Sequence, residues 1–220
     1  MDLCSYRPIS NLSVVSKLME RLVARQLLSH LQASGMLPRL QSAYRANHSS
    51  ETAVLKVLSD ILLAIDSSDL SALVLLDLSA AFDTVDHSIL LRRLETSFGL
   101  KGKVLQWLRT YLVGRRQSMH QGSSTASSAL ICCGVPQGSV LDSILFLLYT
   151  ADLSSLIESR GLRCHLCADD TQIYGYCRPH ATLELMETMS QCIDDVQSWM
   201  HANRLQLNPA KTEILWSATG

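Results

Sequence analysis

An aspartate directly after an apolar run, matched by an aspartate pair further along the chain, constrains this sequence more than any other feature. Residues 73–76 read Leu-Val-Leu-Leu and are followed by Asp77, and the pair is Asp169 and Asp170. An uninterrupted apolar run is typical of a buried strand, so a carboxylate at its end costs desolvation free energy unless a cation or a polar partner compensates. The usual cation is a hard divalent metal such as Mg²⁺, which takes carboxylate and phosphate oxygens as ligands. The pattern therefore predicts a divalent metal site.

The aspartate pair is expected at the tip of a hairpin beside the strand that ends at Asp77. Two short β-prone runs, residues 162–168 and 171–176, flank the pair, as in a tight β-hairpin. An isolated aspartate pair is often only a solvated turn. Here a third element, Gly-Val-Pro-Gln-Gly-Ser at 134–139, is bracketed by glycines, so its backbone can approach a ligand before a helix begins near Ser139. The three elements together favour a ligand site.

Further motifs stand in a fixed order along the chain. Phe82 lies five positions after Asp77. The other segments are Tyr-Arg-Pro-Ile-Ser-Asn-Leu at 6–12, Gln-Ser-Ala-Tyr-Arg at 41–45, the loop at 134–139, Ala-Asp-Asp at 168–170 and Leu-Asn-Pro-Ala-Lys-Thr at 207–212. This series resembles the motif order of a reverse transcriptase, and the first two segments resemble the fingers motifs of the non-LTR (LINE-type) retrotransposon branch. The resemblance spans about residues 6–216.

Strands interleaved with helices, and antiparallel hairpins over residues 117–133 and 162–176, predict an α+β fold whose sheet is covered by helices on one face. The resemblance implies the fingers and palm of a right-hand polymerase, with a mostly antiparallel palm sheet and no thumb. Within a single reverse transcriptase region, 1–220, the fingers would occupy about residues 1–70 and the palm about residues 71–216. The resemblance also implies truncation at both ends, with the endonuclease and thumb regions of a longer polyprotein missing.

Apolar spacing and capping residues predict helices over residues 10–31, 51–65, 88–96, 101–112, 139–157 and 182–203. The residues expected to face inward are Leu12, Val15, Leu18, Leu22, Leu27 and Leu31 in the first helix, Val54, Leu58, Ile61 and Ile65 in the second, and Leu185, Met189, Ile193, Val196 and Met200 in the last. A hairpin is expected from residues 117–121 and 129–133, with 122–128 as its loop.

The resemblance assigns the catalytic and metal-binding roles. Asp77 and Asp169 would bridge two Mg²⁺ ions, with Mn²⁺ as an alternative ion, and Asp170 would support the site less directly. The carbonyl group of Leu78 could complete the coordination of one ion. In such an arrangement the ions lie about 3.5–4 Å apart and stabilise the attacking and leaving oxygens of phosphoryl transfer.

The resemblance also places three residues against the incoming nucleotide. The ring of Phe82 would lie against the sugar and clash with a ribose 2′-hydroxyl, which favours dNTPs. Gln137 and Gly138, in the glycine loop, would contact the nucleotide and the template base. A core aromatic is the alternative for Phe82, and a capping amide is the alternative for Gln137.

Four cations are candidates for the triphosphate and the leaving group. Arg7, Lys17 and Arg45 are the basic residues of the fingers motifs and their surroundings, and each could pair with a phosphate oxyanion. Lys211 matches the family lysine that could protonate departing pyrophosphate as a general acid. Solvated surface cations are the alternative for all four residues.

Composition fits such an enzyme only in part. Lys and Arg number 19 against 20 Asp and Glu, a net charge of −1, whereas nucleic-acid enzymes usually carry a basic surface. A fragment of a longer protein would explain the difference. The chain lacks both an apolar run of membrane-spanning length and a signal-peptide pattern, and its seven cysteines fit reduced thiols. We expect a non-secreted, intracellular protein of the nucleus or cytoplasm, with an RNA template, a DNA primer and dNTPs as partners and no membrane association.

A zinc module is a competing class. Cys164 and Cys167, followed by Cys177 and His180, have the spacing of a zinc site. Residues three apart on a strand point to opposite faces, so Cys164 and Cys167 could share a metal only if their strand is irregular.

Three departures from the family pattern leave a second hypothesis open. Cys167 replaces an aromatic residue before Ala-Asp-Asp, Asp142 and Ser143 replace the usual Gly-Pro, and residues 45–48 lack a Pro-Gly. A charge buried in a close-packed turn costs stability. The first hypothesis is an RNA-dependent DNA polymerase. The second is a catalytically inactive retroelement relic with at most weak binding of nucleic acid or a partner.

Overall fold

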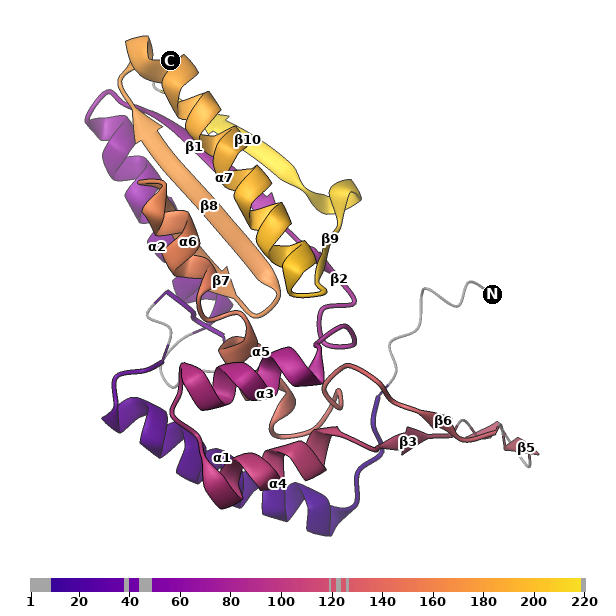
Figure 1. The fold of residues 1–220 in the computed structure, drawn as a ribbon. Helices are drawn as coiled ribbons and strands as arrows, with labels where there is room; N and C mark the ends of the chain where they lie inside the picture. The colour runs from indigo at the N-terminus through magenta and orange to yellow at the C-terminus, as the bar shows by residue number, and fades with distance from the viewer. Residues whose placement is uncertain are drawn as a thin grey trace. The chain divides into compact units, whose positions relative to one another are not determined.

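A computed structural model describes residues 9–37, 40–43, 49–118, 120–121, 124–125 and 127–218 of the chain (Figure 1). The chain forms two compact units, each built from two separate stretches. One unit combines residues 1–37 with 82–149, and the other combines residues 38–81 with 150–220.

The second unit is built on an antiparallel sheet of four strands. Their order is β10-β1-β8-β7, and their bounds are β1 Leu70–Leu76, β7 Arg163–Cys167, β8 Asp170–Cys177 and β10 Glu213–Ser217. The predicted strand before Asp77 and the predicted hairpin are confirmed, and β8 lies directly beside β1. A two-stranded ribbon of β2 (Leu78–Ser79) and β9 (Gln206–Leu207) follows β1.

Helices cover both faces of this sheet, so the prediction of cover on one face is wrong. Tyr174 of β8 packs against Val57 and Ile61 of α2 (Ser50–Asp66) on one face. The next residue, Gly175, faces the opposite way, where a Cβ atom would lie 2.9 Å from Leu185 of α7 (Thr182–Ala202). Helix α6 (Leu153–Ser159) packs against both β7 and α7. The register requires this arrangement because successive strand residues alternate between faces.

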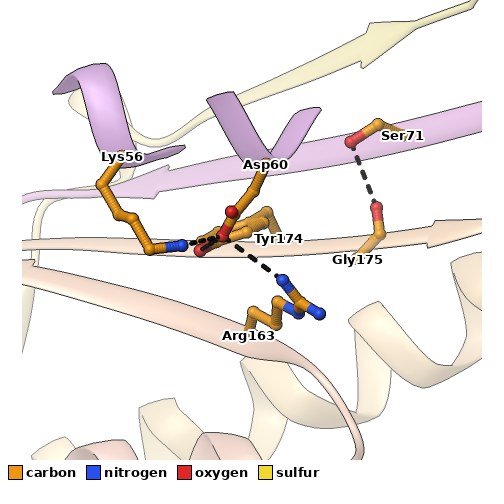
Figure 2. A network of polar contacts seen from close by, with 6 residues as sticks. All are labelled: Lys56, Asp60, Ser71, Arg163, Tyr174 and Gly175. Atoms are coloured by element: carbon orange, nitrogen blue, oxygen red, sulfur yellow. Dashed lines mark hydrogen bonds and ion pairs between the residues drawn. The ribbon is translucent and has the colours of Figure 1, made fainter. Parts of the chain in front are cut away.

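A polar network fixes α2 to the sheet (Figure 2). The Asp60 carboxylate, one-tenth exposed, lies 2.5 Å from the Lys56 ammonium and 3.4 Å from the Arg163 guanidinium, and it accepts a hydrogen bond from the Tyr174 hydroxyl at 2.7 Å. Burial by itself raises the pKa of Asp60, but the hydrogen bonds from Lys56 and Tyr174 and the two positive charges together lower it. The carboxylate is therefore fully partnered, as a buried charge requires.

The first unit is mainly helical. It contains α1 (Val14–Ala33), α3 (His87–Thr96), α4 (Gly102–Leu112) and α5 (Asp142–Tyr149). Two short ribbons accompany these helices, one of β3 (Arg116–Gln117) with β6 (Ala129–Leu130) and one of β4 (His120–Gln121) with β5 (Ser124–Thr125). Fully buried core residues include Leu90, Leu94, Leu108, Leu112, Leu141, Leu145, Phe146 and Tyr149. The predicted hairpin is thus present in outline, although β5 lies within its expected loop and residues 122, 123 and 126 of that loop lie outside the described residues.

The prediction of a single helix over residues 139–157 is wrong, because the helix is interrupted between α5 and α6. Thr150 and Asp152 lie at the break, and side chains of these types compete with helical hydrogen bonds. The Asp152 carboxylate accepts a hydrogen bond from the Trp199 indole at 3.3 Å, and the Leu153 amide donates to the Thr150 carbonyl at 3.1 Å. The remaining predicted helices are present within a few residues of their expected bounds.

The inward faces predicted for the first two helices are partly wrong. In α2 the buried residues are Ala53, Val57, Ile61 and Ala64, whereas Val54 and Leu58 are about half exposed, at 54% and 46%. In α1 the buried residues are Glu20, Ala24, Leu27 and Leu31, whereas Val15, Leu18 and Leu22 are exposed. Both helices carry apolar residues on more than one side, so the spacing alone fits more than one stripe. Small alanines on the chosen face allow close packing.

Candidate active site

The aspartate pair lies in a strained turn between β7 and β8. Cys167 pairs with Asp170, which leaves Ala168 and Asp169 as a two-residue turn. Ala168 has a φ of +57°, in the left-handed region that residues with a side chain rarely adopt. Such strain persists only where surrounding contacts hold it, and it is common at functional sites.

Strand register brings Asp77 to the same end of the sheet. Leu76 of β1 pairs with Thr171 of β8, so Asp77 comes level with Asp170, one residue beyond the last pair. Asp77 and Asp169 are half-buried, and Asp170 is the most exposed of the three aspartates, although part of its surface is covered. The sequence prediction that the hairpin lies beside the strand ending at Asp77 is therefore confirmed.

Asp77 has two partners from the segment after β9. Its carboxylate lies 3.3 Å from the Lys211 ammonium and accepts a hydrogen bond from the Asn208 side-chain amide at 3.3 Å. The Asn208 backbone amide donates to the Asp77 carbonyl at 2.9 Å. Pairing of Leu78 with Leu207 places this segment beside Asp77. The structure thus brings the predicted Lys211 to the site together with Asn208, which sequence reasoning assigned no role.

The negative charges of Asp77 and Asp169 act on the Asp170 carboxyl. Partial burial raises the pKa of the Asp170 carboxyl, and the negative charges of Asp169 and Asp77 raise it further, while Lys211 offsets part of the rise. A neighbouring like charge disfavours the ionised form of a carboxyl unless a cation is present. The donor set consists of carboxylate oxygens, which suit a hard divalent cation.

Within the described residues, no three Cys, His, Asp or Glu side chains already form a metal-binding group. The cation beside Asp77 in this structure is the Lys211 ammonium. Leu78, whose carbonyl group is the predicted further ligand, is buried in β2.

The glycine loop, residues 134–139, lies in the other unit. Its backbone packs against the backbone of Phe82 and Asp83. The Val135 amide donates to the Phe82 carbonyl at 2.8 Å. Gly134 has a φ of +87°, and a Cβ atom there would lie 2.8 Å from the Asp83 carbonyl oxygen. Only glycine fits this approach. The half-buried Phe82 ring packs against Phe146, with ring centroids 4.7 Å apart.

Gln137 and Gly138 are both tied down locally. The Gln137 side-chain amide donates to the Asp83 carboxylate at 2.8 Å, and the Gln137 backbone carbonyl accepts from the Ser10 backbone amide at 2.9 Å. Gly138 is exposed, has a φ of +84° and donates its amide to the Asp142 carboxylate at 2.9 Å. Asp142 also begins α5, where a negative charge is favourable. The stability cost expected for Asp142 therefore does not apply, because this half-buried carboxylate has partners.

Of the three basic residues predicted for the fingers, the structure describes only Lys17. Arg7 and Arg45 lie outside the described residues. Lys17 is exposed on α1, in the same unit as Phe82 and Gln137. The aspartates, Asn208 and Lys211 belong to the other unit.

The structure weighs against the zinc alternative, which required an irregular strand at Cys164 and Cys167. Strand β7 is regular, and every one of its residues pairs with β8, so Cys164 and Cys167 point to opposite faces. Burial raises the pKa of the Cys164 thiol to about 12, which keeps it protonated. Zinc binds the thiolate.

A family model for "Reverse transcriptase (RNA-dependent DNA polymerase)" matches residues 2–219. The chain belongs to the reverse transcriptase family. No described helix is both long and apolar enough to cross a membrane.

Its curated relatives are polymerases of Drosophila transposons. The chain is 37% identical over 149 residues to a probable RNA-directed DNA polymerase from transposon X-element of Drosophila melanogaster, a match that covers 68% of this chain and 16% of the relative. It is 32% identical over 215 residues to that from transposon BS, covering 94% and 23% respectively. The polymerase of mobile element jockey from Drosophila funebris is 27% identical over 216 residues, covering 96% and 23%. The chain thus spans less than a quarter of the length of these relatives.

Solved structures show the same fold. Apo telomerase from Candida tropicalis, truncated from its C-terminal domain, matches with a TM-score of 0.67 and 16% identity, over 93% of this chain and 41% of that one. Telomerase from Candida albicans in complex with a fragment of telomeric RNA matches with a TM-score of 0.64 and 15% identity, over 92% and 35% respectively.

Proposed function

We propose that this chain carries the polymerase chemistry of an RNA-directed DNA polymerase that uses two divalent metal ions. The observation that supports it most is the register that sets Asp77 level with the Asp169–Asp170 turn, with Lys211 at 3.3 Å from Asp77. Membership of the reverse transcriptase family supplies the reaction class. By analogy with the named activities of the transposon relatives, the template would be RNA, the primer DNA and the substrates dNTPs.

The aspartates would hold Mg²⁺, or Mn²⁺ in its place. Bound ions would neutralise phosphate charge during nucleotidyl transfer. Asp77 and Asp169 would be the principal ligands, and the raised pKa of Asp170 is consistent with a site where negative charge exceeds the positive charge of Lys211. Asn208 would orient Asp77 by its hydrogen bond to the carboxylate. Lys211 would offset charge on the departing pyrophosphate or donate a proton to it.

Phe82, Gln137 and Gly138 would form the nucleotide contacts. Phe82 is held against Phe146, and Gln137 is held by Asp83, so each presents a fixed group rather than a mobile one. Lys17, with Arg7 and Arg45, would contact the triphosphate. In the same proposal about residues 1–70 form the fingers and about residues 71–216 the palm.

The inactive-relic alternative is not favoured. The match to the family covers nearly the whole chain, and one of the departures that motivated the alternative, Asp142, is hydrogen-bonded at a helix start. Cys167 remains the departure nearest the aspartate turn, directly opposite Asp170.

RNA-templated primer extension tests the proposal. The chain, supplied with a polymerase thumb, should extend a DNA primer with Mg²⁺ or Mn²⁺, and Asp169→Asn should abolish extension. Glu187→Gln, which removes an exposed carboxylate of α7, is the matched control and should leave extension unchanged. Extension by the Asp169→Asn variant at the unaltered rate would show that this aspartate does not carry the chemistry.

A further inference from the structure

A short segment lies along the outer edge of β7, next to the aspartate turn. The Leu166 amide donates to the Leu40 carbonyl at 2.8 Å, and the Ser42 amide donates to the Leu166 carbonyl at 2.9 Å. Gln41 therefore forms a parallel bridge with Leu166. This segment, residues 40–43, adds a further backbone partner to the strand that leads into the turn.

The Gln41 side chain reaches beyond the bridge to the turn itself. Its carbonyl oxygen accepts hydrogen bonds from the Ala43 amide at 3.0 Å and from the Ala168 amide at 3.1 Å. Gln41 is 2% exposed, so water does not compete freely for these bonds. Ala168 is the left-handed residue that precedes Asp169.

A second contact holds the same segment without touching the turn. The Ser42 hydroxyl lies 2.7 Å from the His165 ring nitrogen, and both residues are buried. The segment is thus anchored to β7 by Ser42 and to the turn by Gln41.

We propose that Gln41 is a positioning residue for the metal-binding aspartates. Its hydrogen bond holds the Ala168 amide and so keeps Ala168 in its strained left-handed conformation, which sets the direction of Asp169. Without that acceptor the half-buried Ala168 amide loses this hydrogen bond, and the turn relaxes away from Asp77. This inference rests on the proposed function, because it assumes that Asp169 binds metal.

The test compares Gln41→Met with Ser42→Ala in the full chain. Methionine has a similar length, fills the same space and offers no comparable acceptor. Two quantities are measured: amide hydrogen exchange at Ala168 relative to Leu166 by NMR, and the Mn²⁺ dissociation constant by electron paramagnetic resonance. Gln41→Met should speed the relative exchange at Ala168 and weaken Mn²⁺ binding, each by about fivefold, the scale of one lost hydrogen bond. Ser42→Ala should change neither, although it lowers the melting temperature.

Other outcomes overturn the proposal. Unchanged Mn²⁺ affinity in Gln41→Met, or equal effects of Gln41→Met and Ser42→Ala, would reduce Gln41 to a structural role. An unprotected Ala168 amide in the unaltered protein would also overturn it, even if Gln41→Met fails to fold. Asp169→Asn distinguishes failure of the proposed function from failure of the proposed role of Gln41. If this variant binds Mn²⁺ as the unaltered protein does, the proposed metal site is wrong. The exchange measurement still shows whether Gln41 stabilises the conformation of the turn.

Discussion

At the scale of single residues, a substitution of Phe82 distinguishes a contact with the nucleotide sugar from a purely structural role in the core. Its ring is half-buried and packs against Phe146. If the exposed part opposes a ribose 2′-hydroxyl, Phe82→Val in the thumb-supplied protein should raise ribonucleotide incorporation relative to deoxyribonucleotide incorporation by about tenfold or more, the scale of one steric contact in a pocket. Phe98→Leu, at a buried position of the same unit, is the control for core damage. An unchanged incorporation ratio in Phe82→Val would show that Phe82 has only a packing role in the core.

Asp170 offers a prediction about stability and pH. Its pKa is raised by partial burial and by Asp169 and Asp77. A carboxyl whose pKa is raised in the folded state contributes stability below its unfolded pKa and loses that contribution as the pH rises through the folded pKa. Without metal at pH 7, Asp170→Asn should therefore raise the melting temperature, and the gain should shrink toward about pH 4. Added Mn²⁺ should stabilise the unaltered protein more than the variant.

Differential scanning calorimetry in chelator checks this prediction, with Glu187→Gln as the control for removal of an exposed carboxylate. A melting temperature of Asp170→Asn that is equal to or below that of the unaltered protein at pH 7 would contradict the crowding of charge at the turn.

Asn208 and Gln41 show what residue-level sequence reasoning missed. Both lie inside recognised motifs, at 207–212 and 41–45, yet neither carries a charge that would mark it as functional. Their roles depend on hydrogen bonds to Asp77 and Ala168, which are 131 and 127 positions away. Asparagine before proline is a local turn signal, but no local pattern shows which carboxylate it contacts.

At the scale of elements, the Asp60 network anchors α2. Asp60→Asn should destabilise the fold by about 1–3 kcal/mol, because it weakens three partnered contacts of a largely buried carboxylate. The pKa of Asp60 is lowered in the fold, so its contribution is present above the unfolded pKa and is lost as the pH falls through the folded pKa. The difference between the variant and the unaltered protein should thus close in acid.

Urea denaturation measures this effect. Lys56→Met removes the more exposed partner of Asp60 and should cost less than about 1 kcal/mol. Equal losses for Asp60→Asn and Lys56→Met would indicate that Tyr174 and Arg163 add nothing to the anchor.

Element types were predictable where the local pattern was unambiguous. The apolar run before Asp77 predicted β1, and apolar spacing with capping residues predicted α2, where the Ser49 side chain accepts a backbone hydrogen bond. The Asp86 cap of α3 was not predicted. Strands β2 and β9 were not predicted because each has two residues and exists only through pairing with the other. Strand β10 was not predicted as a strand, although it pairs with β1 from the sheet edge.

At the scale of the whole molecule, the candidate site depends on contacts far apart in sequence. The register of β1 with β8 brings Asp77 level with Asp170, and the β2–β9 ribbon brings Lys211 within 3.3 Å of Asp77. Sequence alone named these residues by resemblance, but their proximity required the sheet order β10-β1-β8-β7. The chain spans less than a quarter of the length of its transposon relatives.

The most direct measurement of the central claim is a crystal structure of the protein with Mn²⁺, with the ions located by anomalous scattering. Manganese should lie between the carboxylates of Asp77 and Asp169, with the two side chains about 3–6 Å apart, as a shared ion requires. Asp169→Asn should remove this signal. Manganese bound elsewhere, or Asp77 and Asp169 carboxylates that point away from each other in the metal-loaded protein, would contradict the two-metal account.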